Sequence, residues 1–228
     1  TGEASKIAEH LVTHSSPKSA IAETYRSLRT SLQFLGVDKK VKSVIITSGN
    51  PGEGKSTIVA NLAIATAQMG MKTLIVDADL RKPVQHSLFG FEKEPGLIDA
   101  LANDSLRDDL LRKTEVDNLW LLPCGTIPPN PSELLGSKAM KNLQQNLLEE
   151  FDHIFYDTPP VIAVTDAVVL STIVDSLALI IKFGSTTVQS VNHASNLLKQ
   201  VNTKVSGIIL NFVDIQNRYG SYDYYTYY

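Results

Sequence analysis

A glycine-rich segment at residues 49–56, Gly-Asn-Pro-Gly-Glu-Gly-Lys-Ser, has the residue types and spacing of a phosphate-binding loop. Glycines let successive backbone N–H groups turn toward a β-phosphate, and the start of a following helix adds the positive end of its dipole. Lys55 would neutralise the β- and γ-phosphate oxygens, and Ser56 would ligate Mg²⁺. The segment therefore predicts a bound nucleoside triphosphate. The residues expected to contact it are Gly49, Pro51, Gly52, Glu53, Gly54, Lys55, Ser56 and Thr57.

Three aspartates are expected beside these phosphates. Asp77 and Asp79 lie two apart at the end of the strand-like run LIVDADLR, and period-two geometry directs both carboxylates to the same side. The run HIFYD brings Asp157 to the same edge of a sheet, in the position of a Walker-B acid. We expect these acids at one metal site, with Ser56, Asp79 and Asp157 as the Mg²⁺ ligands. An ordinary capping role for Asp157, before Thr158, is the alternative.

The choice of nucleobase depends on a weaker pattern. Asn211-Phe-Val-Asp214 follows an apolar run and has the outline of the guanine-reading sequence N-K-x-D, but Phe212 stands where the lysine belongs. ATP is therefore favoured over GTP. Asn211 is placed to hydrogen-bond a purine, and an Asn that simply forms a turn is the alternative.

The elements that position these residues are short apolar runs alternating with amphipathic segments. Buried runs rich in Val, Ile and Leu are typical of parallel strands, and the alternation predicts a doubly wound α/β fold, a mostly parallel sheet flanked by helices. Helices are predicted over 58–69 and 188–201, and another from Asn130 to about Glu149, with Pro131 at its first position and Glu133 in a capping box. The expected strands are VKSVIITS, KTLIVDA, NLWLLP, HIFYDTPP, SLALIIKF and VSGIIL.

Composition limits the possible classes of protein. The chain has 228 residues, 43% of them hydrophobic, which suits one domain spanning residues 1–228. A net charge of -3 gives no basic field for nucleic acid, so none is expected as a partner. The single cysteine, Cys124, excludes a disulfide framework and suits a reducing compartment.

The two ends are expected to differ from this domain. Residues 1–18 are polar and unpatterned, and residues 219–228 are rich in tyrosine, so both segments are predicted to be mobile. No apolar run approaches the roughly 18 residues needed to span a bilayer, so the chain as given is expected to be soluble. It begins at Thr1 without a secretory leader, which suits a processed product or a piece of a longer chain.

Taken together, the phosphate-binding loop, LIVDADLR and FYDTPP resemble the Walker A, A′ and B motifs of the bacterial tyrosine kinases. The stretches LIVDADLRKP and GTIPPNPSELL also look like that family, and the resemblance extends from about Pro17 to Tyr228. There is no H-R-D or D-F-G motif, so phosphoryl transfer would use P-loop chemistry. A helix over 21–34 carries Glu23, Arg26 and Arg29 in the family's E-x-x-R-x-x-R spacing.

The resemblance implies an ATP-dependent tyrosine kinase that phosphorylates its own tail between subunits. Lys55, Asp77 and Asp79 would be catalytic; Asp77 would orient or deprotonate the phenol, and Asp79 would support it or the metal. Glu23, Arg26 and Arg29 would contact a neighbouring subunit in a ring. From the residues alone, this triplet also fits a solvated ion-pair stripe, and the tail fits a segment that adds to a sheet edge. The implied autophosphorylation sites are Tyr219, Tyr222, Tyr224, Tyr225, Tyr227 and Tyr228.

The resemblance also implies a biological setting. The kinase would regulate capsular or exopolysaccharide synthesis and export from the cytoplasm, recruited to the inner face of the membrane by a membrane-embedded adaptor that activates it. Other protein tyrosines would be substrates, and a tyrosine phosphatase would oppose it. The main alternative is a switch ATPase of the partitioning or division-site kind. Those proteins usually carry a second lysine early in the loop, where this chain has Asn50.

Overall fold

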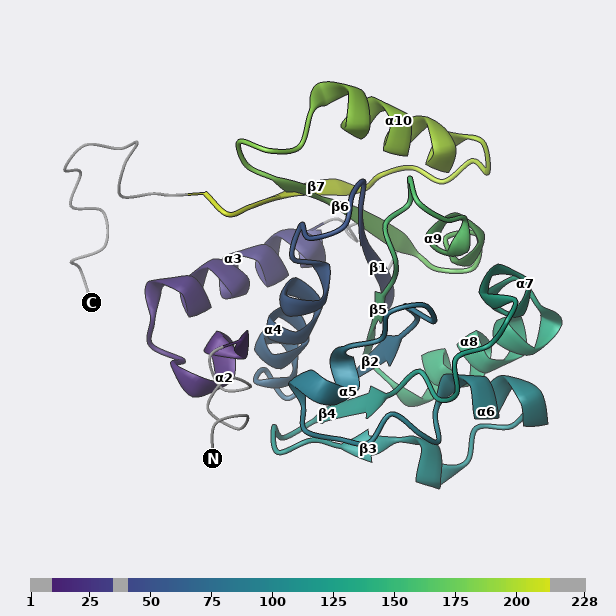
Figure 1. The fold of residues 1–228 in the computed structure, drawn as a ribbon. Coiled ribbons are helices and arrows are strands. Elements are labelled where there is room, and N and C mark those ends of the chain that lie inside the picture. Colours follow the sequence, from purple (N-terminus) through teal and green to yellow (C-terminus); the bar gives the residue numbers. More distant parts are fainter. Residues whose placement is uncertain (1–9, 35–40, 214–228) are drawn as a thin grey trace.

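The computed structural model describes residues 10–34 and 41–213, which form a sheet covered by helices on both faces (Figure 1). Within these residues the sheet has seven strands in the order β3-β4-β2-β5-β1-β6-β7. Every neighbouring pair is parallel except β3 with β4, so the predicted doubly wound, mostly parallel sheet is confirmed. The strands are β1 Ser43–Ser48, β2 Thr73–Asp77, β3 Arg112–Lys113, β4 Leu119–Leu122, β5 His153–Asp157, β6 Ser176–Lys182 and β7 Gly207–Asn211.

The helices divide between the two faces of the sheet. The first group, α2 to α4, lies on one face, and α6 and α8 to α10 cover the other (Figure 1). Their bounds are α2 Val12–Ser15, α3 Ala20–Phe34, α4 Lys55–Ala67, α5 Gln85–Leu88, α6 Leu97–Asn103, the 3-10 helix η1 Asp108–Leu110, α7 Pro131–Leu135, α8 Lys138–Glu150, α9 Asp166–Leu170 and α10 Val188–Lys199.

Strand alternation creates two separate cores. Ile45 points into the core shared with α8 and α10, whereas its neighbours Val44 and Ile46 point into the core shared with α4. A strand buried on both faces must be apolar throughout, which explains the continuous hydrophobic runs in the sequence. Because the central strands are parallel, their carboxyl ends meet at one edge, and the phosphate-binding loop lies there.

Helix α4 is enclosed on nearly every side. Its residues from Ile58 to Ala67 are buried, because the sheet covers one side and α2 and α3 cover the other. An apolar surface all around a helix is what such a central position requires. The element that begins the phosphate site is therefore held by the protein interior rather than exposed at its surface.

The prediction of one continuous helix from Asn130 to about Glu149 is wrong. It is divided into α7 and α8 at Gly136 and Ser137, and the Ser137 hydroxyl accepts a hydrogen bond from the Met140 backbone N–H at 3.1 Å, which starts a new helix. The capping box is also wrong, because the Asn130 side chain donates to Glu133 Oε2 at 2.6 Å instead of accepting from the backbone.

The amino-terminal segment differs from the expectation of mobility in residues 10–18. These residues include α2, and Leu11 and Thr13 are buried against α4. Asn61 of α4 fixes them: its Oδ1 accepts from the Thr13 N–H at 2.9 Å, and its Nδ2 donates to the His10 carbonyl at 2.7 Å. The segment before residue 10 and the expected mobile tail at 219–228 lie outside the described residues.

Two further expectations concern the chain's surroundings. Among residues 10–34 and 41–213, no helix is both long and apolar enough to cross a bilayer. Cys124 is buried as a free thiol in the core, where burial raises its pKa to about 12, so it packs as a small apolar side chain.

Candidate functional site

The phosphate-binding loop connects β1 to α4, as the sequence pattern predicts. Gly52 and Gly54 have φ angles of 76° and 88°, in the left-handed region that favours glycine. A Cβ on Gly54 would also collide with the Asn211 side-chain amide. The two glycines are therefore required by the conformation of the loop itself, before any ligand binds.

Hydrogen bonds from Glu53 within the loop, from Thr186 after β6 and from Asn211 at the end of β7 hold this loop in place. Glu53, only 3% exposed, accepts from the Asn50 N–H at 3.0 Å through Oε2 and from the Thr186 hydroxyl through Oε1. Asn211 Nδ2 donates to the Glu53 carbonyl at 3.0 Å, and its Oδ1 accepts from the Phe212 N–H at 2.9 Å. The amide predicted to read a purine thus contacts the loop backbone, and its purine contact stays a prediction.

Lys55 and Ser56 form the first turn of α4. Lys55 is 8% exposed. Burial raises the pKa of Asp157, and the Ser56 hydroxyl and, to a smaller extent, the Lys55 charge oppose this shift. The helix start, the ammonium and the hydroxyl are therefore brought together, as phosphate binding requires.

Asp77 and Asp157 are paired residues of adjacent strands and are both fully buried. Asp77 Oδ2 accepts from the N–H groups of Val84 and Gln85 at 3.1 and 3.0 Å, and Asp157 Oδ2 accepts from Gln85 Nε2 at 2.8 Å. The Oδ1 atom of each carboxyl is buried without a partner. Two buried acceptor oxygens without donors fit a divalent cation or its water shell.

Burial weakens the acidity of both carboxyls, and neighbouring carboxylates add to the effect. Burial raises the pKa of Asp77 well above its ordinary value, and the neighbouring charge of Asp157 raises it further. Burial raises the pKa of Asp157 to about 6, although the hydrogen bonds from Ser56 and Gln85 oppose the shift. A bound cation would favour the ionised form of both groups.

The expectation that three acids converge on one metal stays a prediction. Within the described part of the chain, no group of three or more His, Cys, Asp or Glu residues is arranged to hold a metal ion. Asp79 Oδ1 accepts from the N–H groups of Arg81 and Lys82 at 3.3 and 2.9 Å, so it closes its own loop. The metal-ligand role predicted for Asp79 stays a prediction, and the buried pair of Asp77 and Asp157 is what the structure shows.

Two sets of contacts in the structure were not predicted from the sequence. Gln85 links the two buried acids, although it lies eight residues beyond Asp77 in a segment without a recognisable pattern. Arg81 donates to both oxygens of the buried Asp166 at 2.9 and 3.0 Å, and the Ser132 hydroxyl donates to Asp166 Oδ1 at 2.6 Å. Only the fold brings these residues together, since they are far apart in the chain.

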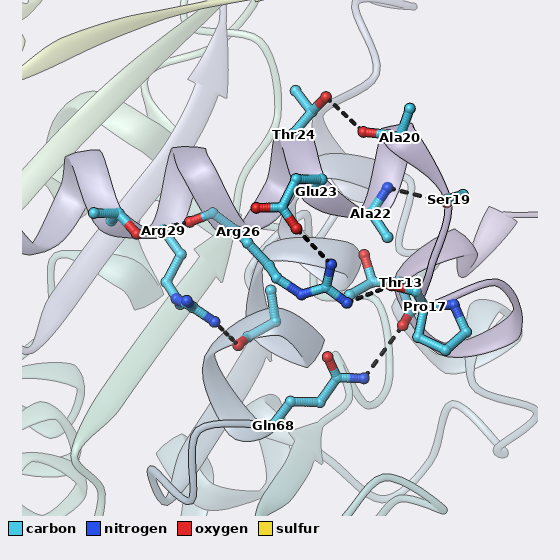
Figure 2. Close-up of polar contacts among 12 residues, drawn as sticks. Thr13, Pro17, Ser19, Ala20, Ala22, Glu23, Thr24, Arg26, Arg29 and Gln68 are labelled. Carbon is cyan, nitrogen blue, oxygen red and sulfur yellow. Dashed lines mark hydrogen bonds and ion pairs between the residues drawn. The ribbon is translucent and has the colours of Figure 1, made fainter. Parts of the chain in front are cut away.

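The triplet on α3 has partners within the chain (Figure 2). Arg26 forms an ion pair with Glu23 at 2.8 Å and donates to the Pro17 carbonyl, which holds the amino-terminal segment. Arg29 donates to the Ala65 carbonyl at 2.8 Å, in the last turn of α4, and burial lowers its pKa. The subunit contact predicted for these three residues stays a prediction.

The fold and the loop define a P-loop nucleotide-binding protein, and comparison with known proteins narrows the class. The family model ParA, described as NUBPL iron-transfer P-loop NTPase, matches residues 39–225. Tyrosine-protein kinase YwqD of Bacillus subtilis (strain 168) is 40% identical and covers 97% of this chain and 93% of that protein. Putative tyrosine-protein kinase CapB of Staphylococcus aureus is 39% identical over 94% of both chains.

Solved structures agree with these relatives. The chimerical protein CapA2B2 is 42% identical with a TM-score of 0.84 and covers 89% of both chains. The kinase domain of Escherichia coli tyrosine kinase ETK is 33% identical with a TM-score of 0.86, covering 94% of this chain and 84% of that one. The chain therefore belongs to the bacterial tyrosine kinases, within the P-loop NTPases.

A septum site-determining protein shares the fold at lower sequence identity. The septum site-determining protein MinD from Pyrococcus horikoshii OT3, complexed with Mg-ADP, is 25% identical with a TM-score of 0.63. It covers 74% of this chain and 69% of that one. This septum site-determining protein is thus a structural relative, but the tyrosine kinases match more of the chain at higher identity.

Proposed function

We propose that the chain is an ATP-dependent protein-tyrosine kinase that phosphorylates its own carboxyl-terminal tyrosines between subunits. The observation that carries the proposal is the buried pair Asp77 and Asp157, each with one free oxygen, beside the Lys55 end of the P-loop. Membership of the tyrosine kinases gives the reaction, phosphoryl transfer to tyrosine. The two carboxyls and Lys55 are groups that suit this reaction.

The residues would divide the chemistry of transfer among them. The loop N–H groups would hold the β-phosphate, Lys55 would bridge β- and γ-oxygens, and Ser56 and Asp157 would hold Mg²⁺. When bound, Mg²⁺ would neutralise charge that develops on the phosphate oxygens. Asp79 would keep its loop, and thereby Asp77, in place through its hydrogen bonds to the backbone.

Asp77 suits the role of the group that orients or deprotonates the phenol. The tyrosine oxygen would form a bond to the γ-phosphorus while the bond to the bridging oxygen of ADP breaks, and the phenolic proton would pass to Asp77 Oδ1. A carboxyl whose pKa is raised by burial accepts a proton more readily than an exposed one. The free, buried Oδ1 is the atom available for that proton.

The acceptors and partners are further parts of the proposal. Six tyrosines in residues 219–228 would be presented to a neighbouring subunit, in a ring that uses Glu23, Arg26 and Arg29. A membrane-embedded adaptor would activate the kinase at the inner face of the membrane, with other tyrosine substrates and a tyrosine phosphatase as antagonist. Regulation of capsular or exopolysaccharide synthesis and export would follow. The curated kinases of similar length and the CapA2B2 structure support this setting.

Phosphopeptide mass spectrometry after incubation with Mg·ATP tests the activity, with and without the cytoplasmic peptide of the adaptor. Lys55→Met should abolish tail phosphorylation without unfolding the protein, whereas Lys141→Met, at an exposed position on α8, should retain it. If the wild type consumes ATP but leaves every tyrosine unmodified even with the adaptor peptide, the switch ATPase becomes the better interpretation.

A further inference from the structure

Gln85 contacts all three nucleotide-binding motifs at once. It is the first residue of α5 and is fully buried. Its backbone N–H donates to Asp77 Oδ2 at 3.0 Å, and its side-chain Nε2 donates to Asp157 Oδ2 at 2.8 Å and to the Ser56 carbonyl at 3.0 Å. One residue thus connects the A′ acid, the B acid and the start of the P-loop helix.

The chemistry of these contacts fixes the orientation of the amide. Both neighbours of Nε2 are acceptors, so only the NH₂ end of the Gln85 side chain can face them, and both of its hydrogens are used. The remaining oxygen, Oε1, is buried without a partner. A glutamate at this position could not donate to Asp157 unless it were protonated, and a shorter asparagine could not reach both acceptors.

Gln85 holds both acids in the same way. Gln85 occupies Oδ2 of Asp77 through its backbone and Oδ2 of Asp157 through its side chain, and the Oδ1 of each is left free. A carboxylate with one oxygen fixed has its other oxygen in a defined position, which is how outer-shell hydrogen bonds orient metal ligands.

We propose that Gln85 is the positioning residue of the divalent-cation site, and that it couples cation binding to nucleotide binding. The proposal rests on the Mg·ATP site of the proposed function. Gln85 holds the Asp157 carboxylate and the Ser56 main chain in one geometry, so the acid from β5 and the hydroxyl from α4 are placed together before a cation arrives. Its free Oε1 is an acceptor for a water of the cation's hydration shell.

The chain contains a matched control in Gln144. Gln144 is 2% exposed, accepts from the Tyr156 hydroxyl through Oε1, and has its own unpartnered Nε2. It therefore shares the burial and the incomplete hydrogen bonding of Gln85, but it lies on α8 and has no hydrogen bond to Asp77 or Asp157. Gln144→Met reproduces the general effect of removing a buried amide.

Titration with a fluorescent ADP analogue, in Mg²⁺ and in EDTA, tests the proposal. We expect Gln85→Met to reduce the Mg²⁺-dependent gain in affinity by about tenfold, the usual cost of losing a hydrogen bond that orients a metal ligand. Its affinity in EDTA should stay within about twofold, because the loop N–H groups that hold the β-phosphate do not depend on the amide. Gln144→Met should keep the wild-type gain.

Two outcomes would overturn the proposal. If Gln85→Met loses the same affinity for the ADP analogue in Mg²⁺ and in EDTA, Gln85 has only a structural role. If the Mg²⁺-dependent gain in affinity is unchanged, Gln85 has no role in cation binding. If Gln85→Met fails to fold, Gln85→Asn retains a buried amide and should show the same selective loss. The assay needs no tyrosine, so it is independent of kinase activity. A wild type without any Mg²⁺ gain would instead contradict the cation site of the proposed function.

Discussion

Asp77 and Asp157 lie directly opposite one another on the parallel strands β2 and β5, and both carboxyls are completely buried. Two acids in such positions cannot both ionise cheaply without a cation. The nucleotide-free protein therefore keeps its binding site in an electrostatically unfavourable state, which ligand binding relieves.

This arrangement predicts an unusual pH dependence for the ligand-free chain. Burial raises the pKa of Asp157 to about 6, above its unfolded value of about 3.9, so the folded state binds the proton more tightly. The stability this provides is present below about pH 4 and is lost as pH rises through about 6. Asp157→Asn should stabilise the ligand-free chain at pH 7 by about 3 kcal/mol, measured by urea unfolding. Asp117→Asn, at an exposed position, should change nothing.

The measurement also has an outcome that would contradict the prediction. If Asp157→Asn is no more stable than the wild type at pH 7, or its advantage does not shrink toward pH 4, the fold does not raise the pKa of this carboxyl above its unfolded value. Mg²⁺ and ADP should reverse the ranking, because the asparagine removes a carboxylate that the proposed cation site uses.

Arg81 and Asp166 predict a second stability effect. Arg81→Met would leave the fully buried Asp166 carboxylate with the Ser132 hydroxyl but without its cation. The cost should be about 2 kcal/mol, below the usual value for a buried pair because Arg81 is 41% exposed. Arg107→Met breaks an ion pair whose two members are both exposed and should cost less than about 0.5 kcal/mol.

A double-mutant cycle separates the pair from other effects of the arginine. Adding Asp166→Asn to Arg81→Met should recover much of the loss, since no buried charge then remains. Strict additivity of the two single changes would show that the ion pair does not stabilise the fold.

A substitution at Asn211 separates two interpretations of its side chain: that it holds the phosphate-binding loop, or that it contacts the purine. Asn211→Ala removes the hydrogen bond to the Glu53 carbonyl that holds the loop. A brace predicts that ADP and GDP analogues both lose affinity by about fivefold, roughly 1 kcal/mol, because both depend on the same loop. A purine contact predicts a change in the ratio of the two affinities. Fluorescence titrations of both analogues decide between these outcomes.

Arg29 is expected to have a measurable role even in a single subunit. Arg29→Met should lower the free energy of unfolding by about 1 kcal/mol, since the Ala65 carbonyl loses its side-chain donor at the end of α4. Sedimentation of the same variant reports the proposed subunit contact. Thr24→Ala, an exposed change on the same helix, should leave assembly intact. Loss of assembly without loss of stability would show that the intrachain bond contributes little.

Local patterns were sufficient to predict most of the fold. The strands and the helix after the P-loop depend on runs of apolar residues and on glycine spacing, both of which are visible in the chain itself. The division of α7 from α8 was missed, although Gly136 ends one helix and the side chain of Ser137 caps the next, and a glycine followed by a serine is a local signal for such a break.

The site was also predictable only in part. Motifs located Lys55, Ser56, Asp77 and Asp157, because their chemistry requires fixed spacing within one segment. Gln85 could not be found in this way, since its role depends on hydrogen bonds to three segments that meet only in the folded chain. The pattern of Arg26 and Arg29 was recognised, but their hydrogen bonds to the Pro17 and Ala65 carbonyls depend on how α3 packs against the preceding segment and against α4.

Helix α4 has Lys55 at one end and the carbonyl bound by Arg29 near the other, separated by about 15 Å of rigid backbone. If a neighbouring subunit draws Arg29 away from Ala65, the far end of the nucleotide-binding helix loses a partner in the same event. The affinity between subunits and the affinity for nucleotide would then be linked, and each would alter the other by an equal factor. Assembly and nucleotide occupancy would thus act as mutual effectors through a single helix.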